Sequence, residues 1–263
     1  MTQPIPDLNL HLPTALILID NQSAFTHPDT LSHWGTARSN PHYEENLQSL
    51  VSSFRAAKAQ AQALEAATSP SASTSEPKSV EKQAPTLEII HIFHSSDSPT
   101  SPLHHAHPLN GIQPLAFAAP ATDGTEPIFW KNVNSAFIGT TLEAYLRARD
   151  IRQIVCAGLT TDHCVSTTVR MAANLGVVDR PRSVGNGRVR FRSDGSRENE
   201  VSVDKGRVIL AADATATFGK GGFDAETVHR VSVASLEGEF ADVMDTEAIV
   251  QALNRVGGAR RQL

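Results

Sequence analysis

The sequence predicts an α/β fold in which helices cover both faces of a largely parallel β-sheet, giving three layers. Two observations predict this fold. Short, almost wholly apolar segments recur along the chain, as is typical of parallel strands that are buried on both faces. Longer segments with the apolar spacing of amphipathic helices lie between them, so strands and helices alternate.

Five segments are predicted to be strands. Each is short, and most are rich in Ile, Val, Leu and Ala. In chain order they are residues 14–20, 87–93, 127–130, 153–158 and 208–213. The first ends in an acidic residue, Asp20, and the fourth leads directly into a polar segment that contains Cys164. These two strand ends carry the first functional signals.

Four segments have the apolar spacing of helices. They are residues 43–66, 140–149, 162–175 and 225–240. In the first, Leu47, Leu50, Val51 and Phe54 recur at the interval that places them on one helix face. The third helix follows the fourth strand with almost no loop between them.

We expect a single domain, residues 1–263, with two loop insertions. Residues 68–84 are rich in Ser, Pro, Glu and Lys and hold too few apolar side chains to offset the entropy of ordering, so a disordered surface loop is expected. Residues 180–205 are rich in Arg, Gly and Ser. Acidic residues dilute these arginines, so a solvated loop is favoured over a nucleic-acid-binding patch.

The composition is typical of a soluble globular protein. The chain is 40% hydrophobic and 19% charged, and its net charge of −5 gives no case for binding nucleic acid or an anionic membrane. No run of about 18 apolar residues indicates a membrane span. Residues 1–12 lack the features of a secretory signal, and only two cysteines occur, so we expect a cytoplasmic protein without disulfides.

The strongest functional signal is Cys164, in the first turn of the helix predicted at 162–175. A helix N-terminus offers free backbone N–H groups and partial positive charge. Thr161 or Asp162 is the expected N-cap. This setting favours a thiolate, so we expect the pKa of Cys164 to lie below the value of about 8.5 of a free thiol. The alternative is a buried structural cysteine, which is our interpretation of Cys156 in its apolar strand.

Asp20 and Lys131 are expected at the same edge of the sheet as Cys164. Each directly follows or ends a predicted strand, and ligands of open α/β sheets bind beyond the carboxyl ends of the strands. Considered alone, Asp20 is explained equally well as a turn residue or as a catalytic residue. Lys131 alone is better explained as a solvated surface residue. The three residues together indicate a catalytic site.

The combined pattern resembles the isochorismatase-like cysteine hydrolases, relatives of nicotinamidase and N-carbamoylsarcosine amidase. The matching motifs are Asp20-x-Gln22-x-x-Phe25; Lys131 with Ser135-Ala136-Phe137 and Thr141-Leu142-Glu143; Gly158-x-x-Thr161-Asp162-x-Cys164-Val165; Asp213-Ala214-Thr215-Ala216; and His229. The likeness runs from about residue 14 to 250. It implies a Rossmann-like, six-stranded, mostly parallel sheet, a catalytic triad of Asp20, Lys131 and Cys164, and a homodimer or homotetramer.

The resemblance also implies a mechanism. Asp20 would accept the thiol proton, and Lys131 would stabilise the thiolate. A cis peptide at Leu159–Thr160 would aim the backbone N–H of Thr160, with that of Cys164, at the oxyanion. The cysteine favours hydrolysis of an amide, ureido or carbamoyl C–N bond in a small molecule. An isochorismatase-type vinyl-ether hydrolase and a non-catalytic binding or scaffold protein are the alternatives.

Substrate contacts are predicted for Gln22, Phe25, Trp34 and Phe137. Phe25, Trp34, Phe137 and also Trp130 are candidates for an apolar pocket, although ordinary packing explains each of them equally well.

Histidines gather in the segment that follows the second predicted strand. His104-His105-x-His107 lies in a loop rich in Pro and Ser, and the Asp-x-His signature of metal-binding relatives is absent, so we expect neither a metal nor another cofactor. His94, at a strand end, is a candidate for substrate contact. His91 is interpreted as a core residue.

Overall fold

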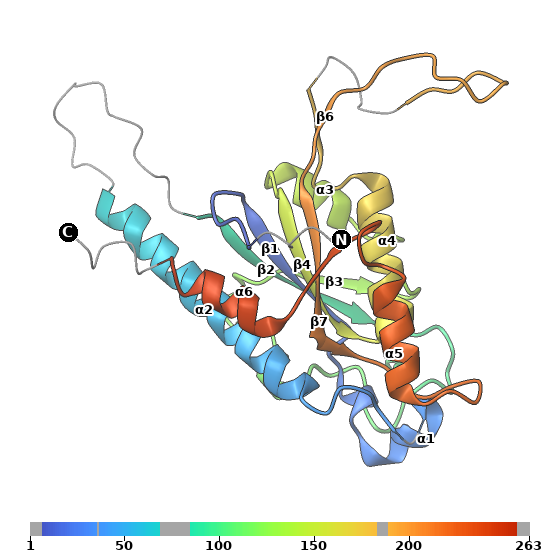
Figure 1. The fold of residues 1–263 in the computed structure, drawn as a ribbon. Coiled ribbons are helices and arrows are strands. Elements are labelled where there is room, and N and C mark those ends of the chain that lie inside the picture. Colours follow the sequence, from blue (N-terminus) through green and yellow to red (C-terminus); the bar gives the residue numbers. More distant parts are fainter. Residues whose placement is uncertain (1–6, 36, 69–84, 183–188, 257–263) are drawn as a thin grey trace.

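The computed structural model describes residues 7–35, 37–68, 85–182 and 189–256 (Figure 1). They form a six-stranded parallel sheet in the order β3-β2-β1-β4-β7-β8, with helices on both faces. This arrangement confirms the predicted three-layer α/β fold. Apart from Thr68, the predicted insertion at 68–84 lies outside the described residues.

The strands coincide with the buried apolar segments. They are β1 (Thr14–Ile19), β2 (Leu87–His94), β3 (Ile128–Lys131), β4 (Gln153–Leu159), β7 (Arg207–Ala216) and β8 (Asp242–Met244). The central strands β1 and β4 are buried at every position, because helices cover both faces of the sheet. The prediction did not locate β8, which has only three residues and lies half-buried at one edge.

Helices α2 (Tyr43–Thr68) and α6 (Thr246–Leu253) cover one face of the sheet, and α3 (Leu142–Ala148), α4 (Ser166–Leu175) and α5 (Ala225–Ala234) cover the other (Figure 1). A short helix, α1 (Leu31–Trp34), lies below the sheet in this view. Leu47, Leu50 and Phe54 of α2 are fully buried, as their spacing predicts. The helix predicted at 225–240 ends earlier, because the following residues form turns through Gly238 at φ +79°.

The described part of the second insertion is an arm that projects away from the sheet (Figure 1). At its base, β5 (Arg180–Pro181) pairs antiparallel with β6 (Val203–Asp204). The guanidinium of Arg152 donates to Asp204 and ties this hairpin to the start of β4. No helix in the described ranges is long and apolar enough to cross a membrane.

Gly158 allows β4 to approach the end of β1. A Cβ atom at this position would lie 2.0 Å from the carbonyl oxygen of Ile19, and the φ of Gly158 is +127°, which side-chain-bearing residues rarely adopt. Ile19 pairs with Gly158 in the parallel register. Asp20 therefore emerges from the sheet beside the turn that follows β4.

Candidate active site

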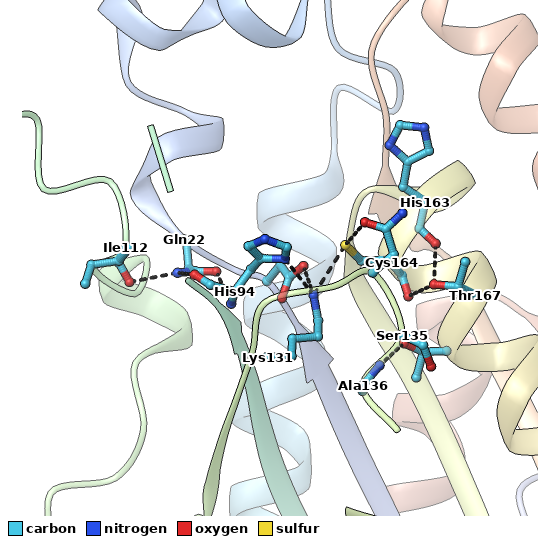
Figure 2. Close-up of polar contacts among 12 residues, drawn as sticks. Gln22, His94, Ile112, Lys131, Ser135, Ala136, His163, Cys164 and Thr167 are labelled. Atoms are coloured by element: carbon cyan, nitrogen blue, oxygen red, sulfur yellow. Dashed lines mark hydrogen bonds and ion pairs between the residues drawn. The ribbon is translucent and has the colours of Figure 1, made fainter. Parts of the chain in front are cut away.

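Asp20, Lys131 and Cys164 meet at the carboxyl edge of the sheet, from β1, β3 and the turn after β4. The Nζ of Lys131 lies 2.7 Å from Oδ2 of Asp20. It lies 3.4 Å from Sγ of Cys164, which Figure 2 shows beside it. All three residues are buried. The structure thus brings together the three residues proposed from the sequence, although Lys131 follows Asp20 by 111 positions.

Asp20 turns the chain out of the sheet and keeps one carboxylate oxygen available. Its φ is +50°, a left-handed conformation that Asp adopts more readily than most residues. Its backbone N–H donates to the carbonyl of Ile92, which holds the turn against β2. Oδ2 accepts from Lys131, whereas the buried Oδ1 has no hydrogen-bond partner within the described part of the chain. Oδ1 is therefore placed to accept a proton.

Lys131 ends β3 directly opposite His94, which ends β2. The Nδ1 of His94 lies 3.2 Å from Nζ of Lys131, so the ammonium has three acceptors: an oxygen, a sulfur and a nitrogen. Burial lowers the pKa of His94, and the adjacent Lys131 charge lowers it further. The imidazole is consequently neutral at pH 7, and its Nδ1 can accept a proton from the ammonium. The sequence placed His94 at a strand end but did not show this contact.

The donor atoms of Asp20, His94 and Cys164 lie within 4.8 Å of one another, and such a set could hold a metal ion. In this chain, however, the Lys131 ammonium forms hydrogen bonds with all three residues. The lysine therefore supplies the positive charge at the centre of this group.

Cys164 lies in a wide, π-type helical turn, Thr161–Val165, which leads into α4. Thr160 is the N-cap and makes no side-chain cap bond, so the prediction of Thr161 or Asp162 as the N-cap is wrong. The carboxylate of Asp162 accepts instead from Thr217 and Lys220. These partners reach Asp162 because the segment after β7 packs beside the turn. The expected cis peptide is present at Leu159–Thr160.

The expected low pKa of the Cys164 thiol is also wrong. Burial raises this pKa above its ordinary value, and the Asp20 carboxylate raises it further, whereas Lys131 lowers it. The prediction considered the helix terminus but not the burial of the side chain, which is 7% exposed. These surroundings therefore favour the protonated thiol over the thiolate. Cys156 is fully buried in β4, and burial raises its pKa to about 12.

A cavity of about 560 Å³ opens over Cys164. Aromatic side chains form part of its wall, with the rings of Phe25 and Trp34 at a centroid distance of 4.5 Å. The other described residues along it are largely polar: His33, His94, Ser96, Ser98, Thr100, Ser101, Leu103, Asn134, Thr160, His163, Phe218 and Lys220. Two of the predicted substrate contacts, Phe25 and Trp34, thus face this space.

Gln22 and Phe137 are not among the residues that line the cavity. Gln22 is fully buried, and its carboxamide bonds to backbone groups of His94 and Ile112 (Figure 2). Phe137 packs against the core between the sheet and helices α3 and α4. Trp130 lies on the edge strand, where its ring packs on Phe93. The side chain of Gln22 therefore supports the site from behind and does not face the cavity.

Comparison with known proteins decides the family. Residues 14–248 match the model of the isochorismatase domain. The chain belongs to the isochorismatase family. This membership confirms the resemblance inferred from the motifs and places the chain among the isochorismatase-family hydrolases.

Individual relatives align with most of the chain. The uncharacterized isochorismatase family protein YrdC of Bacillus subtilis strain 168 is 32% identical over 241 residues, which cover 90% of this chain and 94% of YrdC. A solved isochorismatase-family structure from Chromobacterium violaceum ATCC 12472 is 29% identical, with a TM-score of 0.63, and the match covers 97% of this chain and 100% of that one. N-carbamoylsarcosine amidase from Thermoplasma acidophilum is 16% identical, with a TM-score of 0.52 and coverage of 90% and 98%. The last likeness concerns the fold alone.

Proposed function

We propose that this isochorismatase-family protein is a cysteine hydrolase that cleaves the C–N bond of a small-molecule amide, ureido or carbamoyl compound. The observation that carries the proposal is the position of Cys164 at the cavity wall, with Asp20 and Lys131 behind it. A thiol nucleophile, a carboxylate base and a neighbouring ammonium together can carry out covalent acyl transfer.

The first half of the reaction forms a thioester. Oδ1 of Asp20 accepts the proton of Cys164 while Sγ attacks the acyl carbon. The backbone N–H groups of Thr160 and Cys164 stabilise the oxyanion of the tetrahedral intermediate. When the C–N bond breaks, the protonated Asp20 gives its proton to the departing nitrogen, which leaves as ammonia or an amine.

The second half releases the acid. Asp20 accepts a proton from a water molecule, and the resulting hydroxide attacks the thioester carbon. The C–S bond breaks, and Asp20 returns the proton to the sulfur. The Lys131 ammonium stabilises the anionic forms of Cys164 and Asp20. The raised pKa of Cys164 fits this cycle, because the thiol needs its base only when substrate is present.

A screen for released ammonia or amine tests the proposal. Wild-type protein is incubated with a panel of small primary amides, ureido acids and carbamoyl compounds, and Cys164→Ala is the matched control. We expect nitrogen release from at least one compound with the wild type and none above background with the variant. Thioester accumulation in acid-quenched samples, detected by intact mass, adds an independent readout.

The same experiment separates the alternatives. Vinyl-ether hydrolysis proceeds by protonation of carbon and attack by water, so it needs no thiol, and Cys164→Ala would retain turnover of isochorismate. A binding or scaffold protein would release nothing from any compound. Equal turnover by the wild type and Cys164→Ala would rule out the cysteine mechanism.

A further inference from the structure

The Lys131 ammonium has three protons, and three side chains receive them. Asp20 and Cys164 are the groups that the proposed reaction uses, and His94 is the third acceptor, at 3.2 Å from Nδ1 to Nζ. His94 is half-buried at the cavity wall, and its ring stands beside Lys131 (Figure 2). With a partner for each proton, the ammonium has one preferred orientation. Without His94, it could rotate and would have to find another acceptor.

Gln22 holds His94 in place through the backbone. Its Nε2 donates to the carbonyl of His94 at 2.9 Å, and its Oε1 accepts from the N–H of His94 at 2.8 Å. Nε2 also donates to the carbonyl of Ile112 at 2.9 Å. Figure 2 shows the carboxamide of Gln22 between these two backbone segments. Since Gln22 lies two positions after Asp20, one short segment provides both the base and the support for the histidine.

We propose that His94, held by Gln22, is a positioning residue whose neutral imidazole accepts the third proton of the Lys131 ammonium and thereby directs the other two at Asp20 and Cys164. The inference rests on the proposed function, since it assigns His94 a part in preparing that site. His94 reaches the reacting atoms through Lys131. The same geometry predicts that Nε2 carries the imidazole proton.

Protonation of His94 would break its hydrogen bond with the Lys131 ammonium. Two cations would then face each other, and the ammonium would lose its third acceptor. The charged and titratable groups around the ring are Lys131 on β3, Asp20 after β1, Asp97 in the loop after β2 and Cys164. Burial and Lys131 outweigh the two carboxylates and keep the pKa of His94 below its usual value of 6.5. The site should therefore lose its geometry only at acidic pH.

Two substitutions at position 94 separate positioning from packing. In His94→Asn, the side-chain oxygen can take the place of Nδ1 as an acceptor but does not titrate. His94→Ala removes the acceptor. We expect His94→Asn to retain turnover within about threefold of the wild type and to lose the acid limb of the pH profile that His94 causes. We expect His94→Ala to lower kcat by about 10- to 100-fold, as for loss of a hydrogen bond to a charged group, with a smaller change in KM.

A measurement without substrate keeps this test independent of the proposed function. The Lys131 ammonium is observed by 15N–1H NMR in protein labelled at lysine, with the signal assigned through Lys131→Met. We expect a slowly exchanging signal in the wild type, in His94→Asn and in the control His105→Ala, whose side chain is exposed in a loop, but not in His94→Ala. An unchanged signal in folded His94→Ala would overturn the positioning role, whatever the turnover. A His94-dependent signal in a protein that hydrolyses no amide would instead contradict the proposed function.

Gln22 provides a second check on the same inference. Gln22→Leu should weaken the ammonium signal, and adding this change to His94→Ala should cause little further loss, because both act through one contact. Independent, additive losses in folded protein would show that Gln22 does not act through His94.

Discussion

Oδ2 of Asp20 and Nζ of Lys131 lie 2.7 Å apart, and both side chains are fully buried. Removing two charges from water costs several kcal/mol for each, and their mutual attraction recovers this cost only when the geometry is good. A buried ion pair is therefore weak evidence for stability. Its position behind a cavity that also exposes a cysteine fits the proposed reaction, in which the second oxygen of Asp20 is the base.

Removing one partner of this pair should cost more than removing both. Lys131→Met leaves the Asp20 carboxylate buried and uncompensated, so we expect the free energy of unfolding to fall by about 3–5 kcal/mol. The double variant Asp20→Asn/Lys131→Met should recover much of this loss while remaining inactive. Urea unfolding of the two single variants and the double variant measures the coupling. If the effects of the single variants simply add, the two charges are not coupled as the structure indicates.

The alkylation rate of Cys164 should report its raised pKa. Because burial and Asp20 disfavour the thiolate, we expect slow labelling by iodoacetamide at pH 7 and a steep rise above pH 9 in the substrate-free protein. Asp20→Asn should move the midpoint to lower pH, and Lys131→Met should move it to higher pH. Peptide mapping separates Cys164 from the buried Cys156. Rapid labelling of the wild type at neutral pH would contradict the direction of this shift.

Gly158→Ala should separate β1 from β4 and disturb the site. The added Cβ would lie 2.0 Å from the backbone oxygen of Ile19, which is not free to move like the end of a flexible side chain. We expect a loss of about 3 kcal/mol or more in stability, together with loss of turnover. Gly221→Ala is the matched control: its φ is also positive, at +60°, but nothing lies within 4 Å of the added atom. A similar change in melting temperature for both variants would exclude the close approach as the cause.

Glu126 should stabilise the protein above moderately acidic pH. It accepts two hydrogen bonds from Arg55 and one from His91. Burial favours its neutral form, but these partners outweigh it and lower the pKa of Glu126 from 4.5 to about 2. A depressed carboxyl pKa contributes stability above the unfolded value, and this contribution is lost as the pH falls through the folded value.

We therefore expect Glu126→Gln to lower the free energy of unfolding by about 1–3 kcal/mol at pH 7. The difference from the wild type should shrink as the pH falls from 4.5 to about 2. Denaturant unfolding at a series of pH values measures it. Glu143→Gln, which removes a half-exposed helix ion pair with Arg147, should change stability by less than about 0.5 kcal/mol. A pH-independent difference for Glu126→Gln would contradict the linkage.

The order of strands and helices could be predicted because the apolar patterns that indicate them are local in the sequence. A strand buried on both faces, such as Thr14–Ile19, is apolar along nearly its whole length. Helix α2 shows its buried face as a periodic pattern of apolar residues. The edge strand β8 has no such signal, since three residues, of which only Met244 is buried, are too few to form a pattern. The segment that contains β5 and β6 was predicted to be a loop, because strands of two residues depend on their pairing and leave no pattern in the composition.

The sequence by itself determined the layers of the fold, the family, and the choice of Asp20, Lys131 and Cys164 as the candidate site residues. Strand ends and the spacing of motifs are local features that can be recognised in the sequence. Only the tertiary structure decided that burial raises the pKa of Cys164, that Gln22 bonds to the backbone of His94, and that His94 contacts Lys131. A pKa depends on how deeply the side chain is buried and on which charges face it. A hydrogen bond such as that from Gln22 to His94 joins residues that are 72 positions apart, and only packing brings them together.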